Sequence, residues 1–279
     1  KSRSRGLGDV YKRQALLPII LFPLTGGLEL SETTASFGHK YVFLYLGGFI
    51  IAIAMQIWNL HKRIALNIIS FIGTDVIKII LGFMVATAFL SMWISNTATA
   101  VMMLPIAMAI VDQLKDNPNT IENENKIFGK ALMLGIAYSA SIGGISTLIG
   151  TPPNLILAGV VEETFGYEIT FATWFKFGFP ISLILLFLCW KYLTGIAFKF
   201  EQKSFPGGQK EIRNQLQKLG QITYEEKLVA SIFAMTAIAW VTRDFILKLI
   251  IPVIDDTIIV MISALIIFLL PNKKGKRRL

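Results

Sequence analysis

The sequence has little charge, a single cysteine and two histidines. Charged residues make up 16% of its 279 residues, hydrophobic residues make up 54%, and the mean hydropathy is +0.61. Such a composition is rare among soluble domains and typical of proteins that cross a membrane several times. The lone Cys189 excludes an internal disulfide. His39 and His61 lie apart in the chain, and we expect both to be solvated rather than to bind a metal.

The net charge of +9 resides at the two ends of the chain. Residues 1–13 and 273–279 account for all of it, whereas residues 14–272 carry no net charge. A basic surface for nucleic acid is therefore not expected. The apolar segments also lack a set of nucleophile, base and carboxylate, so we predict that the protein is not an enzyme and has no organic cofactor.

Residues 1–14 have no apolar period and resemble translated adaptor or cloning sequence, so we exclude them from the fold. Apolar segments follow at about 15–24, 41–60, 76–111, 131–161, 174–198, 225–241 and 257–270. Basic residues gather at 61–63, 199–227 and 273–278, and the positive-inside rule places these loops on the cytoplasmic side. We therefore expect a multi-pass integral protein of the cell (inner) membrane.

A polar cluster interrupts the apolar run 79–111. This run has roughly 33 residues, whereas one membrane crossing needs about 20. Ser95, Asn96 and Thr97 lie at its middle, where unpaired polar groups are costly. Two half-length helices with a turn at these three residues avoid both difficulties. A pair that enters and leaves on one side also keeps the basic loops cytoplasmic, so we predict a re-entrant hairpin.

A second polar break lies at 139–154, inside another apolar span. Pro152 and Pro153 cannot continue a helix that precedes them, and Gly143, Gly144 and Gly150 allow close approach or unusual backbone angles. We predict an unwound stretch between two half-helices. Its carbonyl, hydroxyl and amide oxygens are uncharged and suit a monovalent cation, whereas the N-termini of half-helices suit a carboxylate.

Plainer alternatives exist for both breaks. Serine, asparagine and threonine in membrane helices often only form hydrogen bonds between helices. The Gly-Thr-Pro-Pro-Asn stretch at 150–154 could be a structural kink. For Ser91, a hydrogen bond to a carbonyl of its own helix competes with a role facing Ser95.

The two breaks also carry a family resemblance. Residues 93–100 (WISNTATA) with 102–105 (MMLP), then 141–144 (SIGG) and 150–154 (GTPPN), resemble the divalent anion–sodium symporters, which transport dicarboxylates, citrate and sulfate. The resemblance covers essentially residues 15–279. It implies an all-α polytopic membrane protein, namely the first repeat of an inverted-repeat transporter with a re-entrant hairpin and a broken helix.

The resemblance also implies a site. Ser91, Ser95 and Asn96 would bind sodium, the coupling ion, together with a backbone carbonyl from the glycine-rich loop. We choose Gly150 for this carbonyl, although spacing alone does not fix which one points inward. The substrate carboxylate would meet residues of both breaks: Asn96, Thr97, Thr151, Pro152 and Asn154.

The family has two inverted repeats, each with its own Ser-Asn-Thr hairpin, whereas this chain has one such triplet. We therefore interpret the chain as the N-terminal half of a transporter, truncated at both ends. We expect scaffold-like helices at 15–73, a hairpin and broken helix of transport type at 74–171, and at 172–279 a helix, a cytoplasmic connector and the start of a second repeat.

The function predicted from these observations is sodium-coupled transport of di- or tricarboxylates such as succinate, by an elevator-like movement and in a homodimer, as the family implies. A sulfate carrier or an anion exchanger of the same fold remains open. A non-transporting membrane assembly module, in which the polar breaks only join helices, is the alternative from another class.

Overall fold

The computed structural model describes residues 14–73, 75–115, 122–200 and 208–271. The chain divides into two compact units, of which one ends at Phe43 and the other begins at Leu44. In the first unit, α2 (Leu17–Thr25) packs against α3 (Leu30–Phe37). Helix α3 begins with a capping box, because the backbone N–H of Glu29 donates to the carboxylate of Glu32.

The second unit holds the polar breaks. Helix α4 (Lys40–Ile57) crosses the boundary between the units and is followed by α5 (Leu60–Ile72), α6 (Val76–Ser91), α7 (Asn96–Lys115), α8 (Glu122–Ile145), α9 (Pro152–Phe165) and α10 (Phe171–Lys191). Next come the π-helical turn η1 (Tyr192–Ala197), α11 (Gly208–Leu219), α12 (Tyr224–Thr242), η2 (Arg243–Leu247), α13 (Lys248–Ile250) and α14 (Asp256–Leu269). All these elements of the described residues are helical, as expected.

Four described helices are long and apolar enough to cross a membrane: Leu30–Ile57, Asn125–Ile145, Phe171–Ala197 and Tyr224–Ile250. The helices Val76–Ser91, Asn96–Asp112 and Asp256–Leu269 are apolar but shorter. With 16 residues, α6 measures about 24 Å, less than the hydrocarbon thickness of about 30 Å. By length, the first four could cross a bilayer, whereas α6 standing upright could not.

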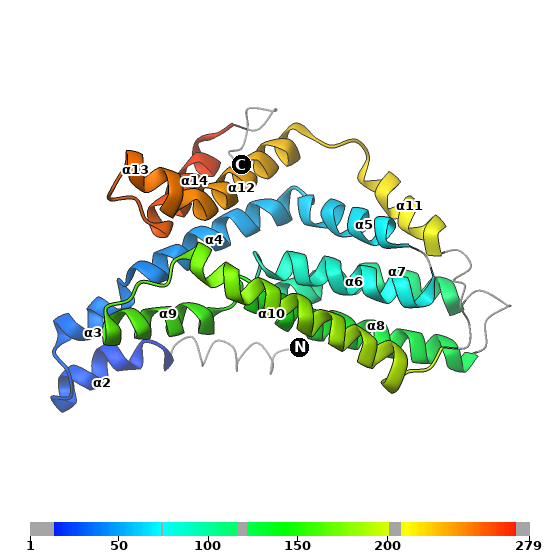
Figure 1. Ribbon diagram of the computed structural model, residues 1–279, viewed down its shortest axis with the longest axis horizontal. Helices are drawn as coiled ribbons and strands as arrows, with labels where there is room; N and C mark the ends of the chain where they lie inside the picture. The colour runs from blue at the N-terminus through cyan, green and yellow to red at the C-terminus, as the bar shows by residue number, and fades with distance from the viewer. Residues whose placement is uncertain (1–13, 74, 116–121, 201–207, 272–279) are drawn as a thin grey trace. The chain divides into compact units, whose positions relative to one another are not determined.

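Helices α6 and α7 form an antiparallel pair that packs on α8 (Figure 1). Along α8, Gly135 lies against Met84 and Gly143 lies against Ala88, so α6 and α8 run in the same direction. Gly129 lies against Val111, near the end of α7, whereas Gly144 lies against Asn96 at its start. The chain therefore reverses between α6 and α7, which is the fold-back that the polar cluster predicts.

The turn lies slightly earlier than expected. Helix α6 ends at Ser91 and α7 begins at Asn96, so Asn96 and Thr97 belong to the first turn of α7 rather than to the turn itself. The reason is the side chain of Ser95, whose hydroxyl accepts a hydrogen bond from the backbone N–H of Ala98 at 3.4 Å. This is the N-cap contact, which starts a helix at the next residue.

The second break is shorter than the predicted stretch 139–154. Helix α8 continues to Ile145, and only residues 146–151 are non-helical. The serines and glycines before the break stay helical because they pack against α6 and α10. Pro152 and Pro153 occupy the first positions of α9, where a missing N–H costs nothing, so they begin a helix instead of interrupting one.

The largest group of buried apolar side chains lies among α5, α6, α7 and α8. It includes Ile69 of α5, Ile80 and Phe83 of α6, Ile110 of α7 and Leu132 of α8. The expectation for His61 is wrong, because it is 4% exposed within α5 and its Nδ1 lies 3.1 Å from the carbonyl oxygen of Met55. Burial also lowers the pKa of His61.

A buried ionic network joins the α9–α10 loop to the ends of α12 and α14. Arg243 is 2% exposed, and its Nη2 and Nη1 lie 2.9 Å from Glu168 and 3.1 Å from Asp256. The same carboxylate of Asp256 accepts from the backbone N–H of Phe171 at 2.7 Å. Burial raises the pKa of Asp256 to about 6, although the charge of Arg243 and the N–H of Phe171 act in the opposite direction.

Candidate ion- and anion-binding site

The two breaks meet at the end of α6. The hydroxyl of Ser91 lies 2.6 Å from the carbonyl oxygen of Ala140 on α8 and 2.8 Å from Oδ1 of Asn96 on α7. A hydroxyl carries one hydrogen and cannot donate to both oxygens. Both contacts are satisfied when Ser91 donates to Ala140 and accepts from the amide N–H of Asn96, with the Asn96 amide turned by 180°. The carbonyl oxygen of Asn96 then remains an open acceptor.

Two glycines let the hairpin approach α8 this closely. A methyl group on Gly143 would collide with the backbone of Ala88, 2.6 Å from its Cα. A methyl group on Gly144 would collide with the amide of Asn96, nearest to Oδ1 and 2.9 Å from Nδ2. Gly150 in turn packs on Gly144, since a methyl group added to Gly150 would lie 2.5 Å from the carbonyl oxygen of Gly144. Asn96, Gly144 and Gly150 therefore form a continuous contact.

Side chains of the second break brace this contact. The hydroxyl of Thr147 donates to the carbonyl of Met92 in the hairpin turn. The amide of Asn154, which is 7% exposed, donates to the carbonyls of Gly144 at 2.9 Å and Thr147 at 2.8 Å. The last carbonyls of a helix lack partners within it, and Asn154 satisfies one of them across the break. The start of α9 is thereby tied to the end of α8.

Helix α10 satisfies two further carbonyls near the end of α8. The indole N–H of Trp174 donates to Ile145 at 2.9 Å, and the hydroxyl of Ser182 donates to Ile142 at 2.9 Å. A carbonyl oxygen has two lone pairs, so these contacts leave acceptor capacity at the break. The arrangement is a rigid shell of neutral oxygens.

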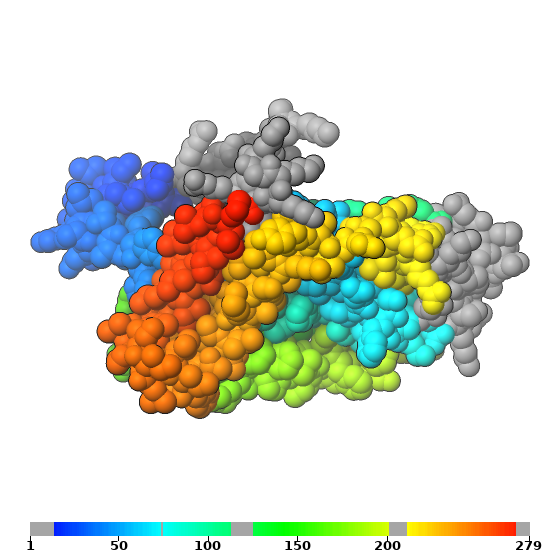
Figure 2. All heavy atoms as spheres, turned by 90° about the horizontal axis from the view of Figure 1, so that it is seen from above, coloured from blue at the N-terminus to red at the C-terminus, as the bar shows by residue number. Residues whose placement is uncertain are grey.

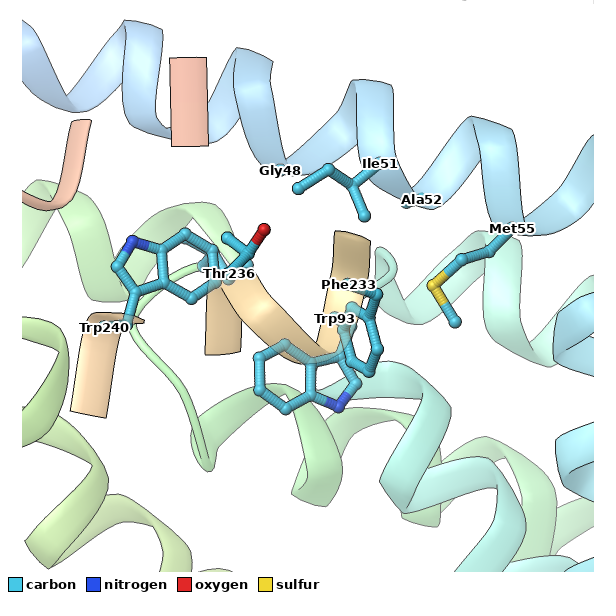
Figure 3. A pocket seen from close by; sticks show the side chains of 9 residues that line it. Gly48, Ile51, Ala52, Met55, Trp93, Phe233, Thr236 and Trp240 are labelled. Atoms are coloured by element: carbon cyan, nitrogen blue, oxygen red, sulfur yellow. The ribbon is translucent and has the colours of Figure 1, made fainter. Parts of the chain in front are cut away.

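An aromatic cluster lies behind the hairpin turn. The ring of Trp93 lies edge-on to Phe233, with centroids 4.8 Å apart, and the rings of Phe171 and Trp240 stack at 4.6 Å. Figure 3 shows Trp93 beside Phe233 at a small cavity that also borders α4 and Trp240. Its volume of about 10 Å³ has room for about one water molecule. Ile149 of the second break lines the same cavity, so both breaks rest on α12 and α4.

The electrostatic character of the site comes from helix ends rather than from charged side chains. Helices α7 and α9 begin at Asn96 and Pro152, and a helix N-terminus carries a positive partial charge. The start of α7 also offers backbone N–H groups, whereas the first two residues of α9 are prolines and have none. The described residues contain no cluster of three or more His, Cys, Asp or Glu side chains that could hold a metal ion. A cation at this site would be held by neutral oxygens and an anion by helix ends.

The sequence also matches a known protein family. A family model described as the sodium:sulfate symporter transmembrane region matches residues 11–272. The chain belongs to this family. Membership confirms the resemblance to the divalent anion–sodium symporters, an integral, multi-pass membrane location and the expectation that the protein is not an enzyme.

Individual relatives are sodium-dependent dicarboxylate transporters by name. The transporter SdcS of Staphylococcus aureus (strain USA300) is 46% identical over 268 residues, which are 94% of this chain and 51% of the relative. SdcS of Staphylococcus saprophyticus is 47% identical over 269 residues, with the same coverage. The chain spans about half the length of the curated relatives that it matches.

Within this symporter fold, the structure brings some of the expected site residues together. Ser91, Asn96, Gly150 and Asn154 are linked directly or through Gly144. Their roles toward sodium and substrate stay predictions. For Ser91, the hydrogen bond runs to a neighbouring helix rather than back to its own.

The remaining expected residues lie at helix starts. Ser95 caps α7 and Thr97 is exposed in its first turn. Thr151 is the N-cap residue of α9, and Pro152 is exposed at its first position. These positions surround the two helix ends that suit a carboxylate.

The predicted site residues include neither Thr147 nor Gly144, although the sequence indicates Gly144 as a position of close approach. Thr147 carries the bond between the breaks, and Gly144, rather than Gly150, is the glycine in contact with Asn96. The paired glycines at 143–144 are a signal for close helix approach that could have directed attention there. Thr147 has no such signal, because its partner is a backbone carbonyl.

Proposed function

We propose that the chain forms the N-terminal half of a sodium-coupled transporter of di- or tricarboxylates such as succinate. Sodium binds where the turn between α6 and α7 meets the break between α8 and α9, through Ser91, Ser95, Asn96 and a glycine carbonyl of the break. The carboxylate of the substrate docks beside it at the two helix starts, against Asn96, Thr97, Thr151, Pro152 and Asn154. The names of the relatives, which mention sodium and dicarboxylates, support both ligands.

One observation carries the proposal most: Asn96 lies directly on Gly144, between the two breaks. An ion between them would contact oxygens from both breaks at once. Binding would then fix the start of α7 relative to α9 and order the helix ends that receive the carboxylate. This gives a physical reason for sodium to bind before the substrate. The contact also favours the carbonyl of Gly144 alongside that of Gly150 as the backbone ligand.

The helix lengths support a re-entrant arrangement of α6 and α7. Helix α6 is too short to cross a bilayer upright, and the pair begins and ends at the same end of α8. In the transporter, a second, inverted hairpin would complete the substrate site. Elevator-like movement of the hairpin-bearing unit and assembly as a homodimer complete the proposal.

Sodium-dependent binding of succinate to the full-length protein tests the proposal. We expect succinate to bind in sodium and at least tenfold more weakly in potassium. Asn96→Ala should abolish the sodium-dependent part without loss of membrane insertion. Asn67→Ala, at an exposed asparagine of α5, is the matched control and should behave as wild type. Equal binding in sodium and potassium, or unchanged binding by Asn96→Ala, would reject the proposal.

Sulfate is a second candidate substrate, because the matching family model is described by sodium:sulfate symport. Competition decides between them: sulfate displaces succinate at comparable concentration if the site accepts both, and only at large excess if it is built for carboxylates. Sodium-driven accumulation distinguishes symport from anion exchange.

A non-transporting assembly module is favoured by a different observation. Side-chain hydrogen bonds connect neighbouring segments at Ser91, Thr147 and Asn154, as they would in a purely structural junction. Thermal stabilisation of the full-length protein by sodium, but not by potassium, supports the ion site, because a ligand stabilises only the fold that binds it. Identical stability in both salts favours the assembly module.

A further inference from the structure

Two amphipathic helices lie side by side at the base of the hairpin pair. Helix α11 packs along α5, and Figure 2 shows them adjacent, in yellow and cyan. Helix α5 buries Leu66 and Ile69, and α11 buries Ile212. α11 also contacts α7. Basic residues at 61–63 and 199–227 place this region on the cytoplasmic side by the positive-inside rule. We expect the basic ends of these amphipathic helices to lie near the membrane surface.

Arg63 fixes the arrangement of these helices. Its guanidinium makes a two-point contact with Glu226 of α12, with Nε–Oε1 at 3.0 Å and Nη2–Oε2 at 3.1 Å. It also donates to the carbonyl of Gly220 at 3.1 Å, just beyond α11. A paired Arg–carboxylate contact is strong and directional. The charges of Arg63 and Glu226 are therefore engaged with each other.

A cavity of about 340 Å³ lies among α5, α7 and α11. Its floor is apolar and consists of Leu66 from α5, Leu219 from α11, and Met102, Pro105 and Ile106 from α7. A volume of this size falls in the range of small-molecule sites. The floor suits a hydrocarbon or glycerol portion of a ligand.

The rim of this cavity is cationic. Lys62 of α5 and Lys218 of α11 line it together with Gln215. Within the described ranges, neither ammonium group has a hydrogen bond or an ion pair. The amide N–H of Gln215 donates to Glu211 at 2.7 Å, so this carboxylate is engaged on α11 and does not line the cavity. Two lysines above an apolar floor match an anionic amphiphile.

An apolar strip leads away from the cavity along α7. Val101, Leu104 and Met108 are 62%, 45% and 43% exposed. Their spacing places them on one face of the helix, next to Pro105 at the cavity floor. The strip has the character of a surface for acyl chains that continues from the cationic rim.

We infer that this cavity binds the phosphate headgroup of an anionic phospholipid from the cytoplasmic leaflet, with the acyl chains along α7. The cytoplasmic leaflet is anionic, and basic pockets between helices on that side bind phospholipid headgroups. Each lysine near the surface contributes about 1 kcal/mol, which is roughly a fivefold effect on binding. The inference does not depend on the sodium site.

Native mass spectrometry of the full-length, delipidated protein tests the inference. Phosphatidylglycerol and phosphatidylcholine with identical chains are the probes. We expect retention of phosphatidylglycerol over phosphatidylcholine, and a loss of roughly 30-fold in this preference for the double variant Lys62→Gln/Lys218→Gln. The matched control Lys199→Gln/Lys227→Gln removes two exposed charges from the same side outside the cavity. The control should retain the preference, and equal losses in both variants would overturn the site in favour of diffuse attraction.

Two further arms separate the remaining outcomes. Inorganic phosphate that displaces phosphatidylglycerol at equal concentration would assign the cavity to a soluble anion and overturn the lipid. Gln215→Cys in a cysteine-free background gives a second readout that keeps both lysines. Phosphatidylglycerol should protect this thiol from a soluble maleimide, whereas phosphatidylcholine should not. A thiol that is unreactive without lipid would show that protein covers the cavity, which would also overturn the inference.

Discussion

Alanine at Gly144 should weaken sodium binding without unfolding the protein. The new methyl group would overlap Oδ1 of Asn96, its nearest neighbour, and would lie 2.9 Å from Nδ2 and 3.0 Å from Cγ, whereas ordinary contacts are about 3.5–4.0 Å. The Asn96 side chain must therefore shift by about 1 Å. Overpacking of this kind costs about 1–3 kcal/mol. If the cost falls on the ion site, sodium affinity decreases by about 5- to 150-fold.

The matched control is Gly135→Ala, in the same helix. Its methyl group would meet Cγ of Met84 at 3.1 Å and Sδ at 3.4 Å, and a flexible methionine side chain can move aside. Both substitutions gain similar helix propensity, so the difference between them isolates the contact with Asn96. The assay is the sodium concentration that gives half-maximal succinate uptake, with thermal stability measured in parallel. Equal sodium dependence in the two variants would refute the assignment of Asn96 and Gly144 to one site.

Three further outcomes are expected. Thr147→Val should lower the stability by about 1–3 kcal/mol in thermal unfolding, because it leaves the carbonyl of Met92 without its partner, whereas Thr147→Ser should restore it. Folding raises the pKa of Asp256 from its ordinary value of 3.8 to about 6, so the fold binds this proton more tightly than the unfolded chain does. The resulting stabilisation of up to about 3 kcal/mol is complete below about pH 4. It is lost as the pH rises through about 6. Asp256→Asn should flatten the stability profile between pH 4 and 6, and an unchanged slope would assign it to other groups. Trp93→Phe removes ring packing but also an indole N–H that has no hydrogen-bond partner among the described residues. The unfolding free energy should therefore fall by no more than about 1–2 kcal/mol, and a larger loss would contradict this offset.

The fold-back between α6 and α7 was predictable because two constraints act together. A polar cluster in the middle of an overlong apolar run cannot lie unpaired in lipid, and the basic loops must stay on one side. The exact turn was not predictable to the residue. Its position depends on the capping hydrogen bond of Ser95, and a serine before an asparagine and a threonine offers three adjacent capping candidates.

The second break shows where local preference fails. Glycine and serine at 139–144 disfavour a helix locally, yet the packing of α8 against α6 and α10 keeps them helical. The prolines were correctly identified as a discontinuity, but their position after the break makes them a helix start. The choice of Gly150 over Gly144 came from the same ambiguity, because spacing along an irregular stretch does not fix spatial neighbours.

Long-range polar contacts were the least predictable feature. Arg243 and Asp256 read as loop charges in the sequence, but they meet in a buried network because three separate segments converge there. His61 is buried because its ring lies against the end of α4, with Nδ1 at 3.1 Å from the carbonyl oxygen of Met55. Neither arrangement leaves a periodic signal in the sequence.

The most direct test of the central claim is a density map of the full-length protein in sodium and a matched map in choline. The account predicts a peak in sodium alone, within about 2.5 Å of oxygens from Ser91, Asn96 and the Gly144–Gly150 stretch. A junction of identical density in both salts, or a sodium peak away from the two breaks, would contradict it.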